Sequence, residues 1–278
     1  MQLTPRYEGA PALRFDPPVD DPAALLLRVH RRLLATLGGL DADQWSAPSR
    51  CAGWATRDVV SHLITVDGFW AASIGAGRAG QPTRFLVGFD PVATPAQLVE
   101  AAAPRTDPEL LADLAAGTDQ LAASLDGLDA GGWARVAEAP PGHLAISEVV
   151  VHALWDAWIH ERDICLPLGI AVPEEPDEVA AALAYAAAVG PALLAGAGAT
   201  RTGAFRVAGT APDVDLVVEV GPAVTVRPAT PADGALPTVA GTSVGLAESF
   251  SLRADRPEVA DDARWMVDTL TEAFDQAG

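Results

Sequence analysis

The chain has 278 residues and half of them are hydrophobic, so it can bury a sizeable core as one large domain or two ordinary ones. Pervasive disorder is therefore excluded. The formal net charge is −19 and all 18 basic residues are arginines. General nucleic-acid binding requires a basic face that neutralises phosphates, so this balance argues against it. It favours a small molecule as the partner.

Two cysteines, Cys51 and Cys165, are too few for a disulfide framework and fit a reducing cytosol, although a single bridge stays open. The first 20 residues contain neither the basic nor the apolar region of a signal peptide. No run of about 18 apolar residues is present, because Gly190 and Pro191 interrupt the Ala-rich stretch that comes nearest. We expect a cytoplasmic protein that does not span a membrane.

The predicted elements begin with a Pro-rich extended arm over residues 1–19. A first helix follows from Pro22 to about Gly38, with apolar residues at helical spacing. After a loop, Thr56 is a candidate N-cap of a second helix that runs to about Ser73.

Further helices are expected where a capping residue precedes proline or where apolar residues recur at helical spacing. They cover 94–127 with a break near Pro104, then 147–166 and 177–197. No strong alternating pattern occurs before residue 198. We therefore expect residues 20–198 to form an all-helical, up-and-down four-helix bundle.

The pattern changes after a Gly- and Ala-rich hinge at 195–203. The segments FRVAGT, VDLVVEV and AVTVRP are β-branched and separated by Gly and Pro, which predicts strands. A short helix is expected over 243–252 and a terminal helix from Pro257. Residues 203–278 should therefore form a small mixed α/β domain.

Among the five histidines, His62 lies in step with the apolar residues Val59, Val66 and Phe69 of the second predicted helix. An imidazole there is at least partly buried. It is either a core histidine that bonds to a carbonyl or a residue of a functional site.

The helix from Ser147 carries Glu148, His152, Asp156 and His160 at intervals of four, so Asp156 and His160 stack on one face, one turn apart. The face has apolar neighbours, and a buried carboxylate and imidazole are costly unless they are paired or bind a metal. Asp156 and His160 are thus either a structural pair or two ligands, as in H-E-x-x-H sites. With His62 they would make three ligands and leave one position open. His152 is the rival ligand, one turn earlier.

Other candidates have weaker support. Gly53 and Trp54 are expected to turn and pack, and Cys51 is a candidate reactive thiol with no activating neighbour in the sequence. Arg162 and Asp163 either orient a ligand or cap the helix end. No Gly-rich phosphate loop or G-x-S-x-G elbow is present.

Two segments resemble a known family. WATRDVVSHL, residues 54–63, is similar to the Gly-Trp-Thr-x-x-Asp-Val-x-x-His-Leu stretch of the mycothiol-dependent maleylpyruvate isomerase family. DAWIHERDICLPLG, residues 156–169, resembles that family's Glu-x-x-x-His-x-x-Asp-Ile…Gly motif. The region 203–278 resembles the small sterol-carrier-like domain that often completes these proteins. The resemblance implies a DinB-like bundle followed by that domain.

The resemblance also implies a divalent metal, zinc above all, held by His62, Asp156 and His160, with Asp156 in place of the family's usual glutamate. It further implies use of mycothiol, the low-molecular-weight thiol of actinobacteria. We therefore expect a metal- and mycothiol-dependent isomerase or S-transferase that acts on a small electrophilic metabolite. An unidentified arginine would hold the anionic thiol or substrate, and the protein would be a monomer or homodimer.

The alternative is a non-catalytic small-molecule-binding or accessory protein of a biosynthetic pathway. Retained metal and bound mycothiol would favour the enzyme, whereas a dry, metal-free cavity would favour the binding protein.

Overall fold

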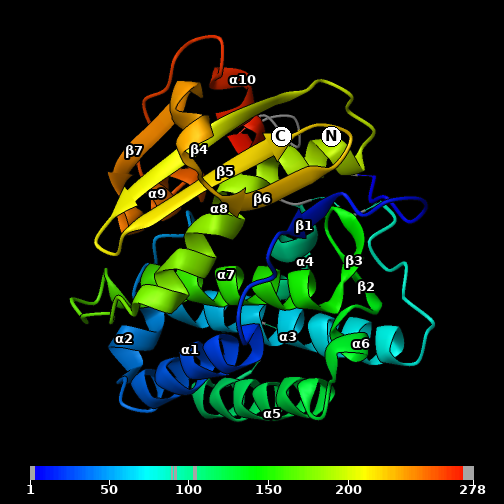
Figure 1. The fold of residues 1–278 in the computed structure, drawn as a ribbon. Helices are drawn as coiled ribbons and strands as arrows, with labels where there is room; N and C mark the ends of the chain where they lie inside the picture. The colour runs from blue at the N-terminus through cyan, green and yellow to red at the C-terminus, as the bar shows by residue number, and fades with distance from the viewer. Residues whose placement is uncertain (1–3, 89, 91–92, 103–104, 272–278) are drawn as a thin grey trace.

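The computed structural model describes residues 4–88, 90, 93–102 and 105–271, so the break expected near Pro104 lies outside the described residues. Four long helices form an up-and-down bundle: α1 (Pro22–Leu37), α3 (Thr56–Arg78), α5 (Asp107–Leu125) and α7 (Ile146–Cys165). Helices α1 and α3 each pack against both α5 and α7 (Figure 1). Short helices α2 (Ala42–Ser46), α4 (Ala93–Ala102) and α6 (Ala130–Trp133) connect them.

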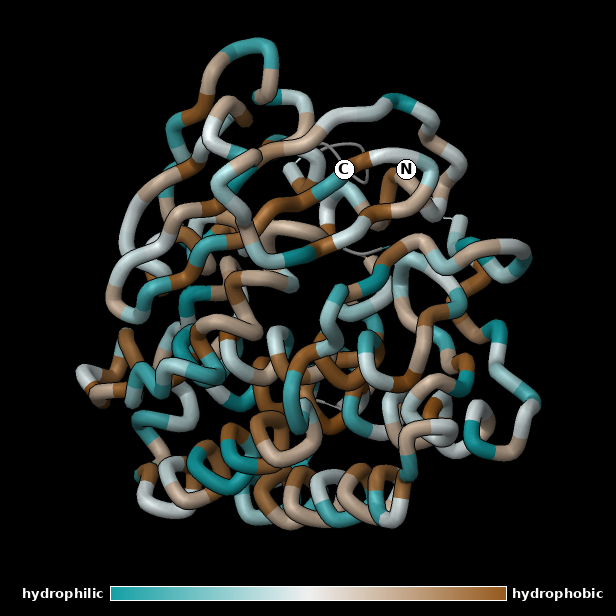
Figure 2. The backbone as a smooth tube through the Cα atoms, in the orientation of Figure 1, coloured by the Kyte–Doolittle hydropathy of each residue, from teal (hydrophilic) through white to brown (hydrophobic). Residues whose placement is uncertain are grey.

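Helix α1 illustrates why these segments fold as they do. The side chain of Asp21 accepts a hydrogen bond from the Ala24 amide at 3.2 Å, and Pro22 occupies the first turn, where a missing N–H costs nothing. Leucines and valines at helical spacing then face the interior, among them Leu26, Val29 and Leu33, all nearly fully buried. Figure 2 shows hydrophobic residues gathered along the inner sides of these helices.

Helix α8 (Pro176–Gly196) lies between the bundle and the sheet and packs against both α7 and strands β5 and β6 (Figure 1). Its alanines allow close approach on all sides. Helices α3 and α8 are long and apolar enough to cross a membrane by length and composition alone. In the fold 83% of the apolar window of α8 is buried, as in a core helix, whereas 50% of that of α3 is buried.

The C-terminal region forms a five-stranded mixed sheet in the order β1-β6-β5-β4-β7. Its strands are β1 (Leu13–Phe15), β4 (Gly203–Thr210), β5 (Val214–Val220), β6 (Val224–Pro228) and β7 (Thr238–Thr242). Strands β4, β5 and β6 form an antiparallel meander, and the 3-10 turn η1 (Pro231–Ala235) precedes β7. Helix α9 (Ser243–Phe250) covers one face.

The N-terminal segment is extended, but it is not a free arm. Strand β1 pairs in parallel with β6, with Leu13 opposite Val224 and Phe15 opposite Val226. Strand β1 therefore adds a fifth strand to the sheet formed by β4–β7.

Two expectations about secondary structure are wrong. The region 20–198 is not all helical, because β2 (Val136–Ala139) and β3 (Gly142–Ala145) form a two-stranded hairpin beside α3 and α7. The terminal helix does not begin at Pro257: helical structure starts with α10 (Arg264–Val267) and resumes at residues 269–271, beyond which the expected helix lies outside the described residues. The bundle followed by a mixed α/β region, in contrast, is the observed fold class.

Candidate metal centre

His62 on α3 faces Asp156 and His160 on α7, the three residues that the sequence singled out. His62 Nε2 lies 3.8 Å from Asp156 Oδ2, and His160 Nε2 lies 3.6 Å from Asp156 Oδ1. The imidazole centroids of His62 and His160 are 4.9 Å apart. One ligand atom from each residue lies within 4.8 Å of the other two.

The donor set suits a divalent cation. Zinc bonds of about 2.1 Å at tetrahedral angles require ligand atoms about 3.4 Å apart; the carboxylate–imidazole separations of 3.6 and 3.8 Å are slightly longer and end on different oxygens of Asp156. Two imidazoles and one carboxylate are typical zinc ligands, and three protein ligands leave a fourth position for water or a thiol. The side chains are 10–14% exposed, so the site is sheltered but reachable.

The charge of the buried Asp156 carboxylate is compensated by its histidine neighbours. Burial alone would raise the pKa of Asp156, but His160 and His62 lower it below the usual range. Burial alone would lower the pKa of His160, but Asp156 and Asp163 raise it to about 10. When no cation is bound, the proton on His160 compensates the negative charge of the Asp156 carboxylate. A divalent cation would replace that proton, so its affinity would depend on pH.

The second nitrogen of His160 has its own partner. Nδ1 lies 3.0 Å from Oδ2 of Asp163, a fully buried carboxylate one turn further along α7. Metal-ligating histidines usually donate their other N–H to a carboxylate, which fixes the tautomer and the ring orientation. Asp163 therefore orients His160, with Nε2 directed toward Asp156.

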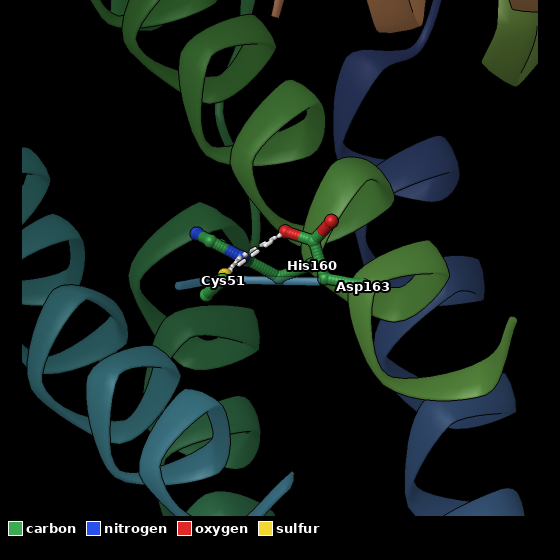
Figure 3. A group of neighbouring side chains, drawn as sticks. All are labelled: Cys51, His160 and Asp163. Atoms are coloured by element: carbon green, nitrogen blue, oxygen red, sulfur yellow. Dashed lines mark hydrogen bonds and ion pairs between the residues drawn. The ribbon is translucent and has the colours of Figure 1, made fainter. Parts of the chain in front are cut away.

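Cys51 completes a second cluster on this side of His160 (Figure 3). Its thiol donates to Asp163 Oδ2 at 3.2 Å and lies 3.7 Å from His160 Nδ1. The loop that carries Cys51 is fixed to α7 by the hydrogen bond from the Arg50 amide to the Asp163 carbonyl, 3.0 Å. Cys51 and Cys165 are both free thiols, and burial raises the pKa of Cys165 to about 12.

The C-terminal region reaches this cluster through Arg253. Its guanidinium contacts both carboxylate oxygens of Asp163 and lies 3.5 Å from the Cys51 sulfur. Glu248 on α9 accepts hydrogen bonds from Arg50 and Arg162, each at 2.8 Å. Arg162 is thus engaged with Glu248 and does not orient a metal ligand.

His152 is not part of the group formed by His62, Asp156 and His160. Its Nδ1 is hydrogen-bonded to the hydroxyl of Tyr185, and its ring packs against Trp70 and Trp155. Trp54, in contrast, lies beside the site, with its ring centroid 5.5 Å from that of His62. The contribution of Arg253 was not predicted, since no local sequence signal links it to residues so distant along the chain.

Known proteins resemble this chain in the sequence of the bundle and in the fold. The family model described as "Mycothiol maleylpyruvate isomerase N-terminal domain" matches residues 26–165, half of the chain. No curated protein sequence matches. Two solved structures share the fold: the mycothiol-dependent maleylpyruvate isomerase and a histidine-to-alanine mutant of it. They are 12% and 13% identical with a TM-score of 0.61, over 88% of this chain and 94% and 93% of theirs. The matched region contains all three convergent donors, and the chain belongs to the mycothiol maleylpyruvate isomerase N-terminal domain family.

Proposed function

We propose that this protein is a metal- and mycothiol-dependent isomerase or S-transferase acting on a small electrophilic metabolite. The observation that carries the proposal is the convergence of His62, Asp156 and His160 with one coordination position left over. Family membership supports the thiol, because the family is named for mycothiol.

The residues in and around the site have defined roles in this proposal. His62, Asp156 and His160 hold the cation, and Asp163 keeps the Nδ1 hydrogen of His160 away from it. Trp54 lies against His62 and limits access of bulk water. A divalent cation, zinc by the chemistry of the donors, lowers the pKa of a thiol ligand and so supplies thiolate near neutral pH.

The two reaction classes differ in the fate of one bond. In both, a carbon–sulfur bond forms between the thiol and an electrophilic carbon. In an isomerase this bond breaks again after the substrate has changed geometry, whereas in a transferase it persists in the product.

The proposal extends to the setting of the protein. We infer a cytoplasmic monomer or homodimer whose partners are a small substrate and a low-molecular-weight thiol, not nucleic acid or membrane. Residues 20–198 would act as the metal-binding domain and 203–278 as the second domain, which contributes Arg253.

Elemental analysis of the purified protein, followed by calorimetry with mycothiol, tests the proposal. We expect about one zinc per chain and mycothiol binding that disappears when the metal is chelated. His62→Ala should lose metal and thiol-dependent turnover together and keep the fold, because the helices retain their apolar faces. Full metal content and turnover in His62→Ala would exclude this mechanism; absence of both metal and mycothiol binding in the native protein would favour the accessory-protein alternative.

A further inference from the structure

Trp70 and His152 lie on the same two helices as the metal ligands, displaced along the α3–α7 contact. Trp70 follows His62 by eight residues, and His152 precedes His160 by eight. At about 1.5 Å per residue, both are about 12 Å along the helices from the paired imidazoles. Asp156 lies halfway between His152 and His160. The ring centroids of Trp70 and His152 are 4.7 Å apart.

The hydrogen on the His152 ring can be assigned from its neighbour. Tyr185 is fully buried, and in the described part of the chain its hydroxyl has one hydrogen-bonding partner, His152 Nδ1. A buried hydroxyl that did not donate there would leave its hydrogen unpaired, so Nδ1 is the acceptor. Burial lowers the pKa of His152 to about 4. The ring is therefore neutral near pH 7 and carries its single hydrogen on Nε2.

Two N–H groups are thereby left without an acceptor. Trp70 is 3% exposed, and its buried indole nitrogen has no hydrogen-bonding partner. His152 is 6% exposed, and within the described residues its Nε2 forms no hydrogen bond, but unlike the Trp70 nitrogen this atom is not completely buried. An unsatisfied buried donor is costly, so the Trp70 N–H, next to a second donor without a partner and on the two helices that carry the metal ligands, indicates an acceptor that comes from outside the chain.

We propose that the Trp70 indole N–H and the His152 Nε2–H bind an oxygen of the substrate. This inference rests on the proposed function and assigns two residues that would hold the carbonyl oxygen of its substrate. Both donors are uncharged, so they select for an oxygen acceptor and not for net negative charge. They are substrate-binding residues, whereas Tyr185 is a positioning residue that acts through His152.

The pair has a defined role in the reaction. When the sulfur of the thiolate bonds to the β-carbon, the π electrons of the C=C bond move toward the carbonyl group, and its oxygen becomes an enolate. Donors placed at this oxygen stabilise the charge that develops on it. Rotation about the former double bond and return of the electron pair then break the carbon–sulfur bond. This releases the thiolate and the isomerised substrate, with no net oxidation.

Nuclear magnetic resonance of the metal-free, ¹⁵N-labelled protein tests the binding step without any turnover. The chain has seven tryptophans, and the Trp70→Phe variant assigns the Trp70 indole signal. We expect maleylpyruvate, or acetone as the smallest carbonyl probe, to shift the Trp70 indole signal and the His152 Nε2 signal. If both signals stay in place at saturating concentrations of each probe, the proposal is overturned, whatever the metal and thiol experiments show.

Trp158 provides a matched control. It is also on the bundle interior, fully buried, with an indole nitrogen that has no partner, but its ring lies against Arg162. Trp70→Phe should lower kcat for maleylpyruvate by about 100-fold with a smaller effect on KM. Trp158→Phe should change kcat by less than about twofold and its indole signal should not respond to the probes. Equal effects of the two substitutions would mean that loss of a buried indole, not of a substrate contact, is responsible.

The tautomer is tested separately through Tyr185→Phe. In the native protein the ¹⁵N signals of His152 should be those of a ring protonated at Nε2, and in Tyr185→Phe a mixture of tautomers should appear. A native ring protonated at Nδ1 would overturn the assignment, because Nε2 could then not donate to the substrate.

Discussion

The guanidinium of Arg253 forms a two-point ion pair with Asp163: Nε lies 2.9 Å from Oδ1 and Nη2 lies 3.0 Å from Oδ2. Asp163 is fully buried and also contacts the ring of His160. The C-terminal region is therefore joined to a candidate metal ligand through one carboxylate. Residues that never touch the metal can influence how the ligand is held.

Asp163→Asn should weaken zinc binding by about 10- to 100-fold, because His160 loses the carboxylate that orients it. It should also lower the free energy of unfolding by about 3 kcal/mol, since the Arg253 guanidinium is left without its partner. Chelator competition and urea unfolding measure the two effects. Asp177→Asn is the control, because that carboxylate pairs with Arg28 at the surface, where it is 54% exposed; similar losses in both variants would contradict the role given to Asp163.

At Asp156, charge should matter more than side-chain length. Asp156→Asn removes the negative charge between His62 and His160 and should reduce the zinc retained after dialysis against a chelator. Asp156→Glu keeps the carboxylate and should retain the metal. Elemental analysis distinguishes the variants, and a full complement of zinc in Asp156→Asn would show that this residue is not a ligand.

Acid should destabilise the fold through His152. Its pKa in the folded protein is about 4, below the value near 6.5 of an unfolded chain, so the unfolded state binds the proton more tightly. The stability this group contributes is present above pH 6.5 and is lost as the pH falls toward 4. Between pH 7 and pH 5 the loss should be about 2 kcal/mol.

Urea unfolding of the metal-free protein at the two pH values measures this loss. The double variant His152→Phe, Tyr185→Phe removes the titrating ring without leaving a buried hydroxyl unpaired, and keeps the other ionisable groups as background. It should lose about 2 kcal/mol less than the native chain. Identical losses would mean that His152 is already protonated in the fold.

Gly190 is required where α8 meets the C-terminal segment. A Cβ there would lie 2.3 Å from Thr269 Oγ1 and 2.6 Å from the Leu270 backbone nitrogen. Gly190→Ala should therefore destabilise the protein by about 1–3 kcal/mol. Gly75→Ala, in helix α3 with nothing within 4 Å of the added carbon, should instead stabilise it by up to about 1 kcal/mol. Thermal unfolding compares the two, and equal melting temperatures would refute the expected clash.

The sequence was most informative where chemistry and periodicity coincide. Intervals of four along α7 predicted that Asp156 and His160 share a face, with His62 as the candidate third ligand, and the resemblance implied the same set; the three residues do lie together. The hairpin β2–β3 was missed because its strands are only four residues long and the four residues of Val136–Ala139 are followed by a turn and Gly142. Such short segments carry too few alternations to indicate a strand.

Contacts between distant segments were beyond reach for a different reason. Arg253 and Cys51 meet Asp163 only because α9 packs on α8 and the loop before α3 lies against α7. The residue spacing within either segment does not predict this contact between segments. The position of His152 was ambiguous because intervals of four place it on the same side of the helix as Asp156, and only its bond to Tyr185 distinguishes its role.

Strand β1 also constrains how the chain is made. It is synthesised before the helical bundle, yet its partner β6 leaves the ribosome only after the whole bundle, since Leu13 pairs with Val224. Until then the edge of β1 that pairs with β6 stays open, although α7 and β3, which also contact this strand, are already present. A nascent chain stopped before β6 would contain the bundle and a β1 strand with an unpaired edge, so completion of the sheet also protects β1 from pairing with another chain.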